Sequence, residues 1–218
     1  MGSSYLSPTT RSPSICGIVL AGGEASRMSQ DKALLPWPSG RAGGVRDTLL
    51  GAWIQLLRPH AEMVIVVGGK NSPNLAPVVY SMGASLIENH APELGRFSSL
   101  KLGLNAVLNY GRDSAIVALG DRPPVQPATL GLLNTAFLRA LEQSFWAAMP
   151  EYDQQRGYPF IVSREMIEAL LRAPLTTTEQ DVIHANETHV CYVPVEDPRV
   201  VSHIETQEDY DRFALENT

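Results

Sequence analysis

The sequence is poor in lysine and in charged residues overall. Lysines account for only three of its 17 basic residues, and charged residues make up 18% of the chain. The formal net charge is −6, whereas a protein that binds duplex nucleic acid usually carries a strong basic excess. We therefore expect no nucleic-acid partner. The three lysines are Lys32, Lys70 and Lys101.

Cysteines are also scarce. Cys16 and Cys191 are the only two, and their distance in the sequence excludes a disulfide scaffold and a cysteine-based zinc site. Both lie in apolar runs, so we expect them to be buried free thiols. Such thiols suit a reducing compartment, and we expect a cytoplasmic protein.

Long apolar runs are absent too. No stretch approaches the roughly 20 apolar residues that cross a bilayer, so no membrane partner is expected. The run at 15–21 is too short for a secretion signal. Residues 1–14 are rich in Ser, Thr and Pro and are predicted to form a disordered leader. Residues 15–218 are long enough to form a single domain with its own core.

Short apolar runs alternate with segments of helical periodicity. This alternation predicts an α/β fold, a Rossmann-like three-layer α/β/α sandwich whose sheet is mostly parallel. A long loop is expected at 22–44, and loops of that length are often functional. The predicted strands are 15–21, 63–67, 84–87, 115–119, 146–149, 160–162 and 190–195, and the predicted helices are 48–57, 73–82, 99–108, 127–141, 164–171, 179–184 and 207–213.

The stretch LAGGEASRMSQDK, from Leu20 to Lys32, begins at the end of the first predicted strand. Gly22 and Gly23 allow the backbone to approach an anion and to turn its N–H groups toward it. Arg27 and Lys32 add two cations that can bind phosphate oxygens. The spacing matches neither a Walker loop nor a GxGxxG fingerprint. A solvated glycine loop with incidental cations is the alternative.

This stretch is similar to the signature LA(G/A)GxSxRMGxxK of nucleotidyltransferases related to molybdopterin guanylyl- and cytidylyltransferases. Ala25 and Ser29 depart from it, where the family has Ser and Gly. The resemblance implies the nucleotide-diphospho-sugar transferase type of fold and the transfer of GMP or CMP to molybdopterin with release of pyrophosphate. It implies that Arg27 and Lys32 are catalytic and hold the β- and γ-phosphates. The residues implied to grip the nucleoside from this stretch are Leu20, Ala21, Gly22 and Gly23.

A second segment, GRFSSLKLG at 95–103, resembles the family's GxxSSLRxG. The resemblance implies that Ser98 and Ser99 hold the nucleotide at its base or ribose. A helix N-cap is the alternative role for a serine at this place, and the two roles are compatible.

Two acidic residues are the metal candidates. Asp121 lies in LGDRP, which resembles the family's LGDQP and follows a predicted buried strand. An aspartate there suits Mg²⁺, and an Asx turn is the alternative. HIETQEDY at 203–210 resembles DIDTPEDY, and Glu205 stands at its metal-binding position. His203 replaces the first Asp and is interpreted as structural, since histidine is a poor Mg²⁺ ligand.

The predicted acceptor side departs further from the family. In Gly157-Tyr158-Pro159, Tyr158 stands where GHP has His, and 176–181 stand where relatives have GDxGAR. These departures leave the acceptor open, and the choice between GTP and CTP stays open as well. The oligomeric state is open too.

The resemblance implies an in-line attack on the α-phosphorus of an NTP by an acceptor phosphate, with an acceptor hydroxyl as the alternative, and Mg²⁺ as the cofactor. The partners would be an NTP and a phosphorylated small-molecule acceptor. Three alternatives remain: a nucleotide-sugar synthase on the same fold, a non-catalytic nucleotide-binding module, and a glycosyltransferase. A glycosyltransferase usually shows an Asp-x-Asp pair, and here Asp121 stands alone at that site.

Overall fold

The computed structural model describes residues 13–23, 31–37, 44 and 46–215. Arg27 and residues 1–12 of the predicted leader lie outside this part of the chain. Ser14, also assigned to the leader, is buried, which corrects that boundary. Its N–H donates to Asp113 Oδ1 at 2.9 Å and its hydroxyl donates to Glu62 Oε1 at 2.8 Å, so Ser14 already belongs to the fold.

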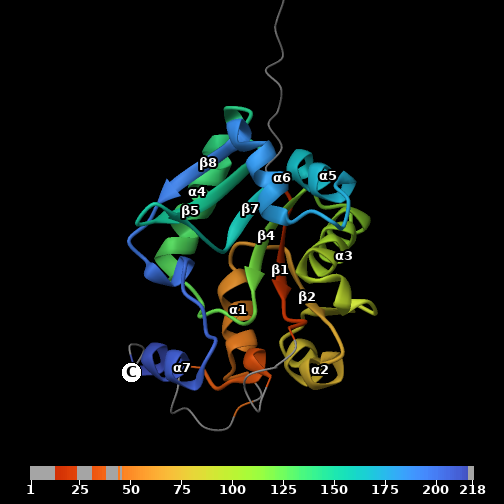
Figure 1. Ribbon diagram of the computed structural model, residues 1–218, viewed down its shortest axis with the longest axis vertical. Helices are drawn as coiled ribbons and strands as arrows, with labels where there is room; N and C mark the ends of the chain where they lie inside the picture. The colour runs from red at the N-terminus through yellow and green to blue at the C-terminus, as the bar shows by residue number, and fades with distance from the viewer. Residues whose placement is uncertain (1–12, 24–30, 38–43, 45, 216–218) are drawn as a thin grey trace, which may run out of the picture.

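Within the described residues, eight strands form one sheet in the order β3-β2-β1-β4-β7-β5-β6, with β8 paired to β5. Figure 1 shows the sheet running from β8 and β5 through β7, β4 and β1 to β2. Strands β1 to β4 are mutually parallel, whereas β7 is antiparallel to both β4 and β5. The strands are β1 (Ile15–Leu20), β2 (Met63–Gly68), β3 (Ser85–Glu88), β4 (Ser114–Leu119), β5 (Ala147–Tyr152), β6 (Gln155–Arg156), β7 (Phe160–Ser163) and β8 (Val190–Pro194).

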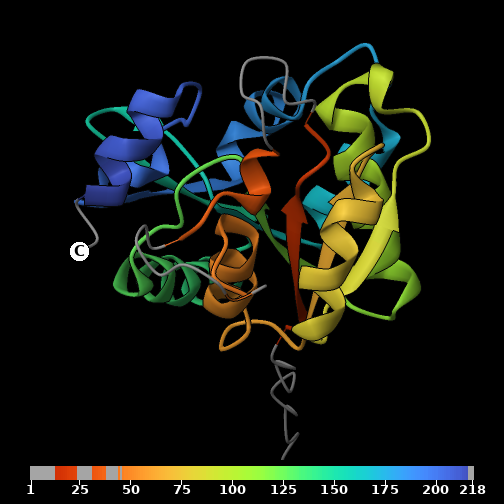
Figure 2. The same ribbon diagram turned by 90° about the horizontal axis from the view of Figure 1, so that it is seen from below.

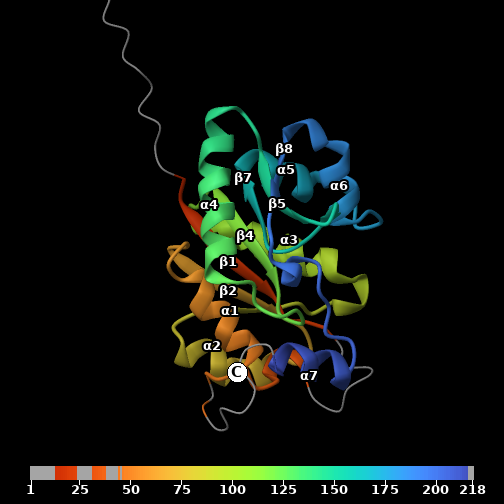
Figure 3. The ribbon, with the colours of Figure 1, turned by 90° about the vertical axis from the view of Figure 1, so that its left-hand side faces the viewer.

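Helices cover both faces of the sheet, as Figure 3 shows. On one face lie α1 (Leu49–Leu57), α2 (Ser72–Ser81) and α4 (Pro127–Glu142), and on the other lie α3 (Arg96–Asn109), α5 (Arg164–Arg172) and α6 (Glu179–Ala185). Successive side chains of a strand point to opposite faces. In β1, Ile15 and Val19 therefore enter the first apolar core, which lies between the sheet and α1, α2 and α4. Cys16, Ile18 and Leu20 enter the second core, which lies between the sheet and α3, α5 and α6. The predicted three-layer α/β/α fold is confirmed.

Several predicted boundaries need correction. The predicted loop at 22–44 contains a short 3-10 helix, η1 (Lys32–Leu34). The strand expected at 146–149 continues to Tyr152, because it pairs with β6 in a hairpin that the sequence pattern did not indicate. Cys16 is buried as expected, and burial raises the pKa of its thiol to about 11. Cys191 is only partly buried, because it lies on β8, next to β5 at the end of the sheet.

A third apolar cluster joins the C-terminal helix α7 (Gln207–Leu215) to the segment that follows the glycine turn. Figure 2 shows α7 on one side of β1 and α2 and α3 on the other. The Tyr210 hydroxyl donates to the Pro36 carbonyl at 2.5 Å. The segments that carry Lys32 and Glu205 therefore pack against one another. The cluster contains Leu35, Trp37, Leu49, Ile204, Tyr210 and Phe213.

Of the helices in the described residues, none combines the length and the apolar character that crossing a membrane requires.

Candidate functional site

A cavity of about 430 Å³ opens at the carboxyl ends of β1, β2 and β4. Leu20 is in register with Val67 on one side and with Leu119 on the other, so the residues that follow these three strands meet at one edge of the sheet. Open α/β sheets bind ligands at this edge. The described residues that line the cavity are Leu20, Ala21, Gly22, Gly23, Asp31, Lys32, Ala33, Lys70, Pro92, Glu93, Gly95, Arg96, Ser99, Leu119 and Asp121.

The glycine turn lies directly against the end of β2. A Cβ added to Gly22 would come within 3.1 Å of the Gly69 nitrogen, and one added to Gly69 would come within 3.1 Å of the Gly22 oxygen. Such contacts are tighter than side chains normally tolerate, so glycine at both positions lets the two strand ends converge. The backbone of Gly22 and Gly23 thereby forms one wall of the cavity.

Asn71 ties this turn to the segment carrying Lys32. Its amide nitrogen donates to the Ala21 carbonyl at 2.8 Å and to the Asp31 carboxylate, and its oxygen accepts from the Gly69 N–H at 3.0 Å. The other oxygen of Asp31 accepts from the Ala33 N–H and caps η1. Lys32 is the first residue of η1. It is therefore held at the cavity by hydrogen bonds that run from Asn71, after β2, to Asp31, the residue that caps η1.

We expect Asn71→Ala to lower the free energy of unfolding by about 1–3 kcal/mol, because partners of Asn71 on both strand ends lose their hydrogen bonds. We also expect it to weaken NTP binding, since Lys32 loses its anchor. Denaturant unfolding and equilibrium titration with an NTP measure the two effects. Asn74→Ala, at an exposed position on α2, is the matched control. Unchanged NTP affinity in Asn71→Ala would contradict the anchoring role.

The two serines of α3 have different surroundings. The buried Asn89 donates to the hydroxyls of Ser98 and Ser99 at 2.8 and 2.9 Å. The Ser98 hydroxyl donates in turn to the Gly95 carbonyl, whereas Ser99 lines the cavity. Neither is the N-cap, because α3 begins at Arg96, three residues before the predicted start. Ser99 is thus placed to contact a ligand, and Ser98 is placed to hold the turn at Gly95.

Of the two predicted metal ligands, one lines the cavity and the other does not. Asp121 is exposed and lines the cavity, whereas Glu205 is exposed and lies outside the described lining. Burial and Arg122 lower the pKa of His203, while Asp121 and Glu205 act to raise it. Both carboxylates are therefore within electrostatic reach of the same imidazole. His203 itself is exposed, so it is not a packed core residue.

The donor set fits Mg²⁺ in the way that nucleotide enzymes usually bind it. The described residues contain no cluster of three or more His, Cys, Asp or Glu side chains that could hold a metal ion by themselves. Mg²⁺ typically binds through one or two carboxylates and completes its shell with water and substrate phosphates. A carboxylate such as Asp121 at the edge of an open cavity meets that requirement.

Four lining residues with charged side chains were missed by the sequence reasoning: Asp31, Lys70, Glu93 and Arg96. Lys70 follows Gly68 and Gly69 at the carboxyl end of a strand, so the strand-end rule could have found it. Arg96 lies directly after Gly95 within a segment already singled out by its serines. Asp31 and Glu93 carried no comparable signal.

Comparison with known proteins shows a family match and a shared fold. Residues 17–190 match the family described as MobA-like NTP transferase domain. A probable molybdenum cofactor guanylyltransferase of Mycobacterium avium is 32% identical over 113 residues, and the match covers 52% of each protein. The chain thus spans about half the length of that relative. A protein of the same description from Mycobacterium bovis is 28% identical over 150 residues, covering 69% of this chain and 68% of the relative.

A solved structure with the same fold is Rv0371c of Mycobacterium tuberculosis in complex with manganese. The TM-score is 0.71 at 24% sequence identity, and the match covers 94% of this chain and 100% of that one.

Proposed function

Because the chain belongs to the family of MobA-like NTP transferase domains, we propose that it transfers GMP from GTP to molybdopterin or a similar phosphorylated acceptor and releases pyrophosphate. Among the structural observations, one gives this reaction its main support. The glycine turn, Lys32 and Asp121 line a single cavity at the carboxyl edge of the sheet. The guanylyltransferase description of the mycobacterial relatives favours GTP over CTP.

The residues of the cavity divide the work of binding. The backbone from Leu20 to Gly23 and the hydroxyl of Ser99 hold the nucleoside. Lys32 binds the β- and γ-phosphates and stabilises the negative charge on the leaving pyrophosphate. Arg27 keeps its predicted role beside Lys32, although it lies outside the described residues.

Asp121 and Glu205 would hold Mg²⁺. When bound, Mg²⁺ neutralises charge on the α-phosphate and orients the attacking oxygen. An acceptor phosphate is already ionised near neutral pH, so the chain needs no general base. Positioning and charge neutralisation therefore account for the catalysis that the chain has to supply.

The decisive experiment is a pyrophosphate-release screen with all four NTPs against molybdopterin and a panel of sugar 1-phosphates. We expect release with GTP and molybdopterin. Turnover with sugar 1-phosphates alone would make the protein a nucleotide-sugar synthase. NTP binding without pyrophosphate release for any acceptor would make it a nucleotide-binding module.

Glu205→Gln tests the second metal ligand. We expect the Mg²⁺ concentration for half-maximal pyrophosphate release to rise by about tenfold, because the neutral amide is a weaker ligand for a hard cation. Glu208→Gln, an exposed change on the neighbouring α7, is the matched control and should leave the titration unchanged. Identical Mg²⁺ titrations for wild type and Glu205→Gln would remove Glu205 from the site.

A further inference from the structure

A buried ionic network adjoins the cavity and has no part in the mechanism above. Glu179 and Tyr158 are only 3% and 5% exposed. Oε1 of Glu179 accepts from Arg96 Nε at 2.9 Å, from Arg96 Nη2 at 2.6 Å and from the Tyr158 hydroxyl at 2.8 Å. Burial and the adjacent Glu179 raise the pKa of Tyr158 well above its ordinary value, so the hydroxyl stays protonated as a donor.

Local structure fixes both buried partners. A Cβ on Gly157 would come within 2.1 Å of the Val200 oxygen, so glycine is required for the close contact that brings Tyr158 against this segment. The Tyr158 N–H also donates to the Val200 carbonyl at 2.8 Å. Glu179 is the first residue of α6, whose N-terminus favours a negative charge.

Arg96 is the member of this network that lines the cavity. It begins α3 and lines the cavity together with Ser99 and Asp121, and its side chain is 46% exposed. Glu179 takes two of the five guanidinium N–H groups of Arg96. Because Glu179 accepts from one side of the guanidinium, the orientation of the group is fixed before any ligand arrives.

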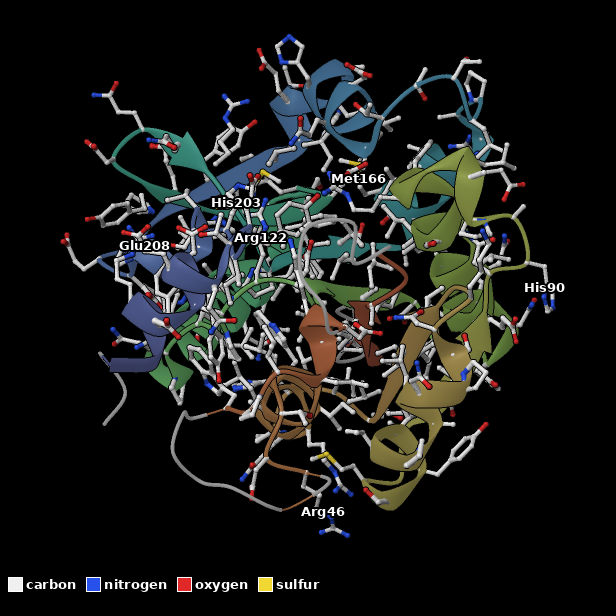
Figure 4. All side chains as sticks on the ribbon, turned by 60° about the horizontal axis from the view of Figure 1, so that its bottom comes forward. Arg46, His90, Arg122, Met166, His203 and Glu208 are labelled. Carbon is white, nitrogen blue, oxygen red and sulfur yellow. The ribbon has the colours of Figure 1, made fainter. Side chains whose placement is uncertain are left out.

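A second arginine, Arg122, lies near the same tyrosine ring as Arg96. The guanidinium of Arg122 lies 4.8 Å from the centroid of the Tyr158 ring, and that of Arg96 lies 5.8 Å from it. Arg122 is only 8% exposed, and its carbonyl accepts from Trp53 Nε1 at 3.0 Å. Figure 4 shows Arg122 beside His203.

The charges of this network do not cancel. Arg96 and Arg122 bring two positive charges, Glu179 brings one negative charge, and Tyr158 is neutral. Asp121 also acts electrostatically on both arginines, but it is the residue assigned to Mg²⁺. With Asp121 engaged by the metal, one positive charge remains next to the cavity wall, and an anionic ligand would balance it.

The order of the strands places Tyr158 on the opposite side of β4 from the glycine turn. The glycine turn lies at the ends of β1 and β2, Asp121 follows β4, and Tyr158 precedes β7, which is on the far side of β4 from β1. A nucleotide whose nucleoside is held by the glycine turn and whose β- and γ-phosphates bind Lys32 would present its α-phosphorus toward Asp121. The second substrate would then reach it from the side of β7 and α6.

We propose that Arg96 binds the anionic phosphate of the acceptor, with Glu179 and Tyr158 as positioning residues and Arg122 as a supporting charge. This inference rests on the proposed transfer to a phosphorylated acceptor. It also connects three departures from the family pattern, since Arg122 replaces Gln, Tyr158 replaces His, and Glu179 lies in the segment that replaces GDxGAR. In this chain the three changes meet in one network.

The test separates acceptor binding from nucleotide binding. The α,β-methylene analogue of GTP with Mg²⁺ is titrated first, and molybdopterin is then titrated into the saturated complex. We expect Arg96→Gln to weaken molybdopterin binding by about 10- to 100-fold, because charge-assisted hydrogen bonds are lost. The affinity for the GTP analogue should stay within about threefold of wild type. Arg96→Lys should show partial rescue.

Positioning is tested by Tyr158→Phe, which removes one hydrogen bond to Glu179 and keeps the ring. We expect the acceptor KM to rise by roughly three- to tenfold with kcat and the GTP KM nearly unchanged. Arg164→Gln, on the exposed side of α5 where Arg164 pairs with Glu168 at 3.8 Å, is the matched arginine control. Thermal unfolding of every variant separates misfolding from lost binding.

Three outcomes overturn the inference. Equal losses of affinity for the GTP analogue and for molybdopterin would assign Arg96 to the nucleotide subsite. Unchanged affinities in Arg96→Gln would make the network purely structural. If wild type binds no molybdopterin, the proposed function fails. The Arg96 subsite is then tested separately, by titrating inorganic phosphate into the complex with the GTP analogue. Phosphate binding that Arg96→Gln abolishes supports the subsite, whereas binding equal in both proteins or absent from wild type overturns it.

Discussion

Lys32→Ala is expected to lower the kcat for pyrophosphate release by about 10²- to 10³-fold, the loss typical of removing one preorganised charge that stabilises the transition state. Lys32 is half-buried and lines the cavity, and its side chain is not part of either core. We therefore expect the free energy of unfolding to change by less than about 0.5 kcal/mol. Steady-state kinetics and denaturant unfolding of the same preparation measure both quantities.

Lys101 provides a control with the opposite pattern. Its ammonium group donates to the carbonyls of Leu171 and Ala173 at the end of α5, away from the cavity. Lys101→Ala should lower the free energy of unfolding by about 1–3 kcal/mol, because it leaves two carbonyls without this donor, and it should retain turnover. Wild-type turnover in Lys32→Ala, or equal losses of turnover in the two variants, would exclude the assigned role of Lys32.

The part of the site that follows strand ends could be predicted from the sequence. Short apolar runs end at Ala21 and at Leu119, and parallel strands place their carboxyl ends at one edge. The glycine turn and Asp121 were therefore expected to share a cavity, and they do. The alternation of strands and helices likewise fixed the three layers, because each side of a strand needs its own helical cover.

The remainder depends on contacts between residues far apart in the chain. Arg96 and Glu179 are 83 positions apart, and no local pattern links an arginine at one helix start with a glutamate at another. The direction of β7 was also missed, because a four-residue apolar run carries no information on strand polarity. The buried Asn89 donates to the hydroxyls of both Ser98 and Ser99, and sequence reasoning had no cause to select it.

Asp121→Asn is the second large effect that we expect. The change keeps the size and the hydrogen-bonding oxygen of the side chain but removes its charge, so the affinity for Mg²⁺ and the alignment of the α-phosphate should both suffer. We expect kcat to fall by about 10³-fold or more. Because Asp121 is exposed, binding of the GTP analogue without Mg²⁺ should persist, whereas the gain in affinity that Mg²⁺ gives wild type should be lost.

The two ends of β4 supply the comparison that makes this result specific. Asp113 precedes the strand, and its Oδ1 accepts from the Ser14 N–H at 2.9 Å and from the Ser114 hydroxyl at 3.2 Å. Asp113→Ala should therefore lower the free energy of unfolding by about 1 kcal/mol and leave turnover unchanged. Asp121 follows the same strand at the edge where ligands bind. Its replacement should therefore lower turnover and leave the free energy of unfolding nearly unchanged. Wild-type turnover in Asp121→Asn, or a matching loss in Asp113→Ala, would show that the chemistry does not lie at this edge of the sheet.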